Sequence, residues 1–405
     1  MSKNNNFFQA DRQTAAVLKH GILARYLATY VGKVGSTSVD HRVGYIDGFA
    51  GSGVYSNPVT GRQTPGSPAI ALQIASKTSG RTLETVFIEK NEKQLASLRS
   101  VVSQFKDPNA QVMFGDVRTQ LPIAMKRFSD IPLLVFLDPF GTALEIESVI
   151  EILTRTGSPA TEVLLNFSVE SVRRIGGRLF EKETAKGRDA SLHRLDDWLG
   201  GPWWRDDFVD TSLDGVEHRI AIAADRVFRK YVAKVNVGAG SSSFVVPVRR
   251  QPHHRPIFYL TLFFQRSFAV MPFNEAVSLA TQDWRHHLHD LDLTYADLVE
   301  YRNPPLPGLS RVDELLQVFE DDETAFKVGT IDAISETIRK SLAERPSVSV
   351  TTDFQRVFGG TMGAGRTLHL RAAWKALAAE GVTNEVPTGS LDRAVIKRVS
   401  ASIFG

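Results

Sequence analysis

Apolar segments of strand length alternate with amphipathic segments of helical length over residues 42–167 of this 405-residue chain. The clearest strand-like segment is PLLVFL at 132–137, which contains no polar residue. Parallel strands that helices cover on both faces have such continuously apolar sequences. The alternation therefore predicts an α/β fold with a doubly wound, mostly parallel sheet.

The expected elements can be placed by periodicity and by the glycine, proline and asparagine residues between them. We expect strands at 42–46, 85–88, 111–114, 132–137 and 162–167. We expect helices at 15–31, 69–76, 92–105, 121–128 and 147–155, and a loop over 56–68. Residues 169–214 read as a helical insertion that contains three tryptophans, followed by a helix at 216–235, a strand pair at 244–250 and 257–265, and a helix after residue 271.

The sequence NPPLPG at 303–308 is the best linker in the chain. It predicts a first domain at 1–302, a linker at 303–309 and a small C-terminal domain at 310–405. In that domain, segments 352–358 and 367–379 read as helices around GGTMG, and 382–386 reads as one strand of a wing. Residues 324–405 hold 11 Lys and Arg against 7 Asp and Glu. This pattern fits a winged-helix-like domain and equally fits a helical packing domain with glycine turns.

Composition excludes several classes of protein. The chain has no cysteine, which rules out disulfides, thiolate nucleophiles and cysteine-bound zinc or iron–sulfur centres. It has no apolar run long enough to span a membrane, and its N-terminus lacks the apolar core of a secretion signal. We therefore expect a cytoplasmic protein. The net charge of +3 is too small to predict nucleic-acid binding by itself.

Acidic residues follow four successive predicted strands. Asp47 precedes the glycine-rich stretch Gly48 to Gly53, Glu89 and Asp116 follow the next two strands, and Asp138 follows the fourth. In an open parallel sheet, ligands bind beyond the carboxyl ends of the strands, and glycine lets the backbone approach a ligand closely. Each acid by itself could equally cap a turn or a helix. The whole series favours one ligand-binding edge.

Basic side chains offer weaker candidates. Arg173 and Arg174 in the insertion, and Arg249, Arg250 and Arg255 in the strand-pair loop, could contact phosphates or could simply be solvated. Lys19 on the first helix could face a ligand carboxylate or a phosphate, or solvent. The spacing of His286, His287 and His289 does not place three ligands on one helical face, so we predict no metal site.

The glycine-rich stretch resembles the cofactor motif of class I S-adenosylmethionine-dependent methyltransferases. DGFAGSG at 47–53 is similar to their D-x-F-x-G-x-G, Glu89 matches the acid that binds the ribose, and Asp116 matches the acid beside the adenine. The resemblance implies a Rossmann-like fold and S-adenosyl-L-methionine as cofactor. It implies that the following residues contact that cofactor: Lys19, Asp47, Phe49, Ala50, Gly51, Gly53, Glu89, Asp116 and Val117.

The sequence DPFG at 138–141 resembles the D-P-F-G of tRNA guanine-N2 dimethyltransferases, a variant of D-P-P-Y. It implies catalytic roles for Asp138, Pro139 and Phe140 in methylating an exocyclic amine of a nucleic-acid base. Such an amine is a poor nucleophile, so positioning by hydrogen-bond acceptors matters more than a strong base. Two features depart from the pattern: the interval from Gly53 to Glu89 is long, and the aromatic residue stands third rather than fourth.

Over residues 7–290 the chain resembles the three-Cys-motif partner family. The resemblance rests on KHGILARYL at 19–27, DGFAGSG, GSP at 66–68, LDPFG at 137–141 and LLNFS at 164–168. It implies a partner protein that is similar to a radical enzyme and carries a three-cysteine motif. The alternative is a methyltransferase-like module that binds nucleic acid or this partner without catalysis.

Overall fold

The chain is described by a computed structural model over residues 3–56, 63–139, 141, 144–155, 160–182, 184, 186–306 and 308–399. It divides into two compact units. One holds Met1–Ile22 and Ser267–Gly405, and the other holds Leu23–Arg266. The sequence placed the division at 303–309, whereas that segment joins two helices within one unit. Within the described part of the chain, no helix is both long and apolar enough to cross a membrane.

A seven-stranded sheet in the order β5-β4-β1-β6-β7-β9-β8 forms the centre of unit Leu23–Arg266. Its strands are β1 (Arg42–Asp47), β4 (Thr82–Glu89), β5 (Ala110–Phe114), β6 (Leu133–Leu137), β7 (Thr161–Phe167), β8 (Ser242–Val248) and β9 (Phe258–Phe264). The first five strands of this order are parallel, and β9 runs antiparallel to both β7 and β8. The predicted α/β class is confirmed, with the qualification that the sheet is mixed.

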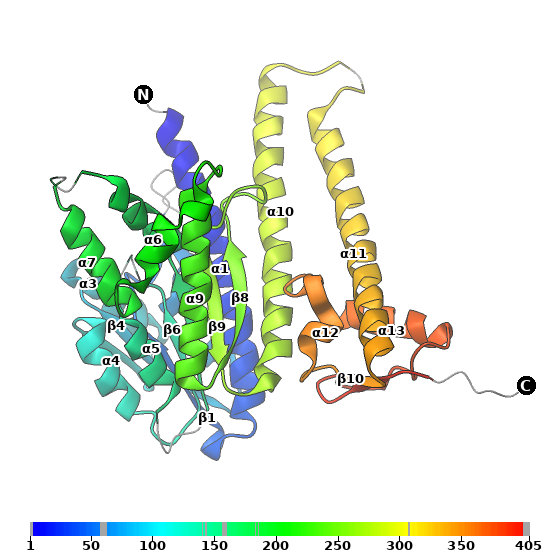
Figure 1. Cartoon of the computed structure of the whole chain (residues 1–405), viewed down its shortest axis with the longest axis horizontal. Helices are drawn as coiled ribbons and strands as arrows, with labels where there is room; N and C mark the ends of the chain where they lie inside the picture. The colour runs from blue at the N-terminus through cyan, green and yellow to red at the C-terminus, as the bar shows by residue number, and fades with distance from the viewer. Residues whose placement is uncertain are drawn as a thin grey trace, which may run out of the picture. The chain divides into compact units, whose positions relative to one another are not determined.

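Helices cover the sheet, as the buried central strands require (Figure 1). Those of this unit that follow α1 (Lys3–Gly35) are α2 (Ser67–Lys77), α3 (Glu92–Phe105), α4 (Val117–Lys126), α5 (Ile146–Leu153), α6 (Val169–Gly176), α7 (Arg188–Leu199), α8 (Arg205–Val209) and α9 (Arg219–Ala239). The helices α6 to α8 occupy the predicted insertion. Its Trp198 stacks on Phe167 at the end of β7, with ring centroids 4.7 Å apart, so the insertion is anchored to the sheet by aromatic packing.

The expected loop at 56–68 is partly wrong. Ser56 ends β2 (Val54–Ser56), which pairs antiparallel with β3 (Gln63–Pro65), and the last two residues of the expected loop begin α2. Strands of three residues are too short to show period-2 alternation, which explains why the sequence pattern missed them. The pair leads directly into α2, where the Gly66 N–H donates to the Gly53 carbonyl at 2.9 Å.

In the unit that contains Ser267–Gly405, α10 (Val270–Arg302) and α11 (Arg311–Glu344) form a long antiparallel hairpin (Figure 1). They are followed by β10 (Ser347–Ser349), α12 (Phe354–Phe358), α13 (Thr367–Ala379) and β11 (Val395–Lys397). The strands β10 and β11 pair antiparallel. Of the strand expected at 382–386, only an isolated bridge between Thr383 and Arg398 forms.

A buried carboxyl group on strand β7 makes stability depend on pH. Glu162 on β7 accepts a hydrogen bond from the Tyr26 hydroxyl at 2.5 Å, and Tyr30 and Arg155 lie in the same cluster. Burial raises the pKa of Glu162 to about 7, an effect that the bond from Tyr26 partly offsets. Because the folded state favours the protonated carboxyl, its contribution is complete below the ordinary pKa of 4.5 and is lost as pH rises through about 7.

We predict that Glu162→Gln flattens this dependence. The free energy of unfolding of the wild type, relative to the variant, should fall by about 3 kcal/mol between pH 4 and pH 8. Urea denaturation over that pH range measures the difference, and Glu151→Gln on the exposed side of α5 is the control. A difference between wild type and Glu162→Gln that does not change with pH would contradict the assignment.

Candidate functional site

The candidate site lies at the carboxyl edge of the sheet, where the direction of winding reverses. From β1 the chain moves to β4 and β5 on one side, and then crosses to β6 and β7 on the other. In open α/β sheets the loops diverge at such a switch point, and ligands bind there. Asp47 ends β1 and Asp138 follows β6, and in the strand register Asp47 pairs with Phe136. The two predicted acids thus stand on neighbouring strands.

The glycine-rich turn after β1 is fixed by backbone hydrogen bonds to both neighbouring strands. The Gly48 N–H donates to the Phe136 carbonyl on β6, and the Ala50 N–H donates to the Ile88 carbonyl on β4, each at 3.0 Å. Gly51 and Gly53 have φ of 63° and 79°, a left-handed region that strains other residues. The motif therefore forms a preorganised, buried to half-buried backbone turn at the carboxyl edge of the sheet.

Two carboxylates hold this turn. Glu89 is 7% exposed, and its two oxygens accept from the Gly51 N–H at 2.8 Å and the Asn91 N–H at 2.6 Å. Asp47 is fully buried and accepts from the Phe49 N–H at 3.1 Å. Most of the predicted cofactor residues, from Asp47 to Gly53 together with Glu89, are thus brought together in one place.

Asp116 extends the series to β5. It caps α4 by accepting from the Arg118 N–H at 3.0 Å, and its side chain is 42% exposed. The Gly115 N–H donates to the Glu89 carbonyl at 3.1 Å, so this turn is tied to the site, and the adjacent Val117 is buried. Capping does not use all of the acceptor capacity of the carboxylate, so Asp116 keeps room for a ligand.

Asp138 has a partner that sequence reasoning missed. The Asn166 amide, on the neighbouring strand β7, donates to Asp138 Oδ1 at 2.7 Å. Asn166 is 1% exposed, and among the described residues its own Oδ1 has no hydrogen-bond partner. A buried acceptor of this kind is costly unless a ligand or water satisfies it. The sign in the sequence was Asn166 itself, a polar residue directly after the apolar run VLL of the strand TEVLLNF.

Two tyrosines face the acids. Burial, with Asp47 and Asp138 nearby, holds the pKa of Tyr45 well above its usual range. Partial burial and the same two carboxyl groups also raise the pKa of Tyr55. Both phenols therefore remain hydrogen-bond donors at neutral pH. The Tyr45 hydroxyl is buried and lacks a partner within the described part of the chain.

The remaining predicted residues are only partly placed. Pro139 is buried beside Asp138, and Phe140 lies outside the described residues. Lys19 is on α1 in the unit that begins at Met1, so its contact with the cofactor stays a prediction.

The predicted basic residues gather at the same edge of the sheet. Because β9 runs antiparallel to β7, the loop before β9 lies where β7 ends. Arg173 on α6 donates to the Pro256 carbonyl at 2.7 Å, and Arg250 lies 3.5 Å from a carboxylate oxygen of Glu170. The remaining members of the group vary in exposure: Arg174 and Arg255 are exposed, and Arg249 is half-buried.

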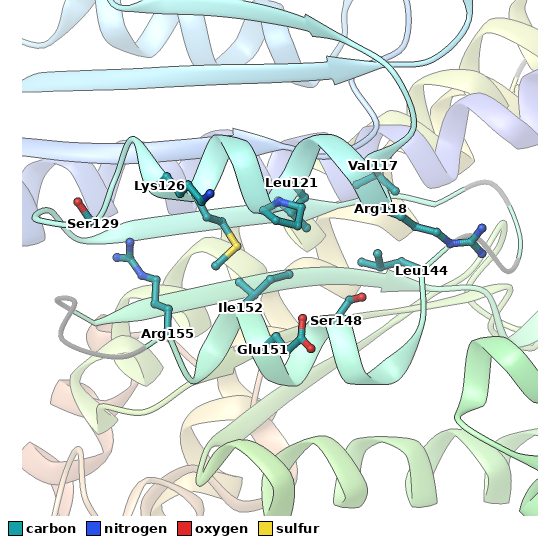
Figure 2. A pocket seen from close by; sticks show the side chains of 12 residues that line it. Val117, Arg118, Leu121, Lys126, Ser129, Leu144, Ser148, Glu151, Ile152 and Arg155 are labelled. Atoms are coloured by element: carbon teal, nitrogen blue, oxygen red, sulfur yellow. The ribbon is translucent and has the colours of Figure 1, made fainter.

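A separate groove of about 360 Å³ runs between α4 and α5 (Figure 2). Figure 2 shows apolar side chains such as Leu121 and Ile152 along it, with Arg118 at one end and Arg155 at the other. Arg155 is already held by the Ile131 carbonyl at 2.8 Å and by the Phe128 carbonyl. None of the four strand-end acids lines this groove.

Solved structures similar to this chain include several methyltransferases. The methyltransferase domain of bacterial CtHen1-CN is 11% identical over 60% of this chain and 99% of its own, with a TM-score of 0.32. An O-methyltransferase from Bacillus cereus in complex with SAH is 12% identical over 63% and 90%, with a TM-score of 0.31. An RNA methyltransferase from Salinibacter ruber in complex with S-adenosyl-L-homocysteine is 15% identical over 35% and 73%, with a TM-score of 0.22.

No protein-family model and no curated protein matches the chain. At identities of 15% or less and TM-scores of 0.32 or less, these structures assign no family and no role to the chain.

The hydrogen bond that Glu89 accepts from the Gly51 N–H can be tested by mutation. In Glu89→Gln, an amide NH₂ must replace one of the two carboxylate oxygens that accept backbone N–H bonds, which loosens the turn. We expect the affinity for S-adenosylhomocysteine to fall about tenfold or more, measured by isothermal titration calorimetry. Glu92→Gln, three residues away and exposed, should bind like the wild type. Equal affinities in all three proteins would exclude this turn from the cofactor site.

Proposed function

We propose that this chain is an S-adenosylmethionine-dependent methyltransferase that acts on an exocyclic amine of a nucleic-acid base. The observation that carries the proposal is the Asp138–Asn166 pair at the switch point, next to the turn that Glu89 holds. The glycine N–H groups, Glu89 and Asp116 can form hydrogen bonds with a polar cofactor that contains a ribose. The Asn166 Oδ1, which accepts no hydrogen bond among the described residues, can accept one from a ligand N–H. The residues present therefore fit the cofactor.

In this proposal, Glu89 accepts from the ribose, Asp116 accepts from the adenine amine, and the turn at 47–53 faces the polar end of the cofactor. The cofactor supplies an electrophilic methyl group. Asp138 and the Pro139 carbonyl accept the two N–H bonds of the target amine and orient its lone pair. Asn166 keeps the Asp138 carboxylate in one orientation through the 2.7 Å bond. Such positioning contributes several kcal/mol, up to about 7–11 in well-aligned cases.

Nucleic acid as substrate is supported by the placement of the arginines. Arg173 and Arg250 lie beside the carboxyl edge, together with Arg174, Arg249 and Arg255, so phosphates bound there would bring a base toward Asp138. A target base within a duplex would have to be flipped out of the stack. We further propose that a three-Cys-motif protein, similar to a radical enzyme, works with this chain, a proposal that rests on the sequence resemblance alone.

The C-terminal elements support a winged-helix-like domain as part of this proposal. The order is helix, strand, two helices and strand: the end of α11, then β10, α12, α13 and β11. A winged helix has this order, with its wing between the last strands. Here the bridge from Thr383 to Arg398 stands where a third strand would pair.

Variants of the Asp138–Asn166 pair separate cofactor binding from catalysis. Asp138→Ala should leave the affinity for S-adenosylmethionine within about threefold, and should lower methyl transfer about 100-fold, because the lost contact serves the attacking nitrogen. Asn166→Ala should lower kcat about tenfold, because the carboxylate is no longer held. Labelled cofactor is incubated with DNA, tRNA, rRNA or protein, and modified nucleosides are identified by mass spectrometry.

Circular dichroism and calorimetry provide the controls for these variants. A stable Asp138→Ala protein that methylates at the wild-type rate would refute the mechanism. A wild type that binds the cofactor and nucleic acid but methylates none of the four acceptors would favour the non-catalytic binding module.

The arginine cluster predicts a strong dependence of nucleic-acid affinity on salt. The affinity of the wild type should fall roughly tenfold or more between about 50 and 200 mM salt, because phosphate contacts release counterions. Arg174→Gln with Arg255→Gln should reduce the slope of log affinity against log salt by about 2, whereas Arg99→Gln on α3 should not change it. Fluorescence anisotropy with labelled RNA and DNA measures both, and a slope of zero would exclude this surface.

A further inference from the structure

The distal part of the α10–α11 hairpin differs in charge from the rest of the chain. We call residues 290–323, without the undescribed residue 307, the arm tip. Residues 290–323 hold ten Asp and Glu and only two Arg, whereas the whole chain has a net charge of +3. Two of the acids have structural roles: Glu300 accepts from the Val312 N–H at the start of α11, and Glu323 pairs with Arg285 at 2.6 Å. The other eight are exposed.

The arm tip is also rich in exposed apolar side chains. Tyr295 is 72% exposed and Tyr301 is 86% exposed. The other large apolar residues exposed there are Leu291, Leu298, Val299, Leu306, Leu309, Leu316 and Val318. Scattered single apolar residues on a surface need no explanation, but a contiguous group marks an interaction site.

Helical geometry shows that part of this group is contiguous. Four residues of α10 follow the spacing i, i+4, i+7 and i+8 and therefore share one face: Leu291, Tyr295, Leu298 and Val299. The face of α10 that meets α11 is a different one. It includes His289, which stacks on Phe319 with ring centroids 4.0 Å apart, and the buried Ala296. At 100° per residue the centres of the two faces are about 120° apart, so the apolar stripe does not face α11.

Aspartates lie on either side of the apolar stripe. At 100° per residue, Asp292 lies about 20° beyond one edge of the stripe, and Asp290 and Asp297 lie about 80° and 100° beyond the other edge. All three are exposed. An apolar helical seam with flanking charges is the arrangement by which one helix selects another of complementary charge.

We propose that the arm tip is a docking surface for another protein, which packs a basic amphipathic helix against the apolar stripe of α10. Lysines or arginines beside the apolar face of that helix would meet the flanking aspartates. The charge argues against nucleic acid and anionic membranes, because both would be repelled. A second copy of this chain is disfavoured for the same reason, since each tip brings eight exposed acids. This surface is independent of the proposed methyl transfer.

The test uses a designed peptide about 20 residues long, with leucines on one helical face and lysines beside them, labelled for fluorescence anisotropy. The full chain should bind it, and should not bind a Leu/Glu peptide of the same pattern. Tyr295→Ala with Leu298→Ala should weaken binding about tenfold or more by removing the apolar contact. Asp290→Asn with Asp292→Asn should also weaken binding by removing negative charge on the two sides of the stripe. Hydrogen exchange of the complex should protect the arm tip.

Val328→Ala is the matched control, because Val328 is 53% exposed on α11 but lies outside the arm tip. It should bind the Leu/Lys peptide like the wild type. Equal binding by all variants, or binding of the Leu/Glu peptide, would overturn the proposal. Sedimentation velocity adds a second decisive outcome: a wild-type dimer that Tyr295→Ala with Leu298→Ala dissociates would show that the stripe binds another copy of this chain instead.

Discussion

Burial of the central strands on both faces is the constraint on which the rest of the structure depends. Every residue of β6 is buried, as are the last five residues of β1, so these strands offer polar groups to a ligand only where they end. The chain places acids at these ends, and it satisfies them with backbone N–H groups of the turns that follow. The carboxylates of Asp47 and Glu89 thereby hold the glycine-rich turn of the candidate site.

The antiparallel direction of β9 explains why the loop that contains Arg250 lies near Asp138 and Asn166. The antiparallel strand β9 begins at the edge where β7 ends, so it brings the Arg250 loop to the side of the sheet that holds Asp138 and Asn166. Arg173 and Arg250 thus lie on the side of the candidate site, whereas acidic residues are concentrated in the arm tip. The net charge of +3 therefore conceals a strongly acidic arm tip.

The sequence predicted the strands that carry the site because their apolar runs are continuous and their ends are marked by acids or glycines. It could not predict Asn166 as the partner of Asp138, because the pairing of β6 with β7 is set by the tertiary structure and leaves no local pattern in the sequence. It missed β2 and β3, which are too short to show a period. The prolines around 303–308 suggested a domain linker, yet they join α10 to α11 within one unit. Prolines and glycines mark where helices end, but they do not show which helices pack together.

A crystal structure of the chain with S-adenosylhomocysteine tests the central claim most directly. The account predicts the ligand at the carboxyl edge of the sheet, with its ribose hydroxyls on Glu89, its adenine beside Asp116 and its sulfur directed toward Asp138. It also predicts that a donor from the ligand, a substrate or an ordered water satisfies the Asn166 Oδ1. Ligand bound instead in the groove between α4 and α5, or no ligand at the carboxyl edge at saturating concentration, would contradict this assignment.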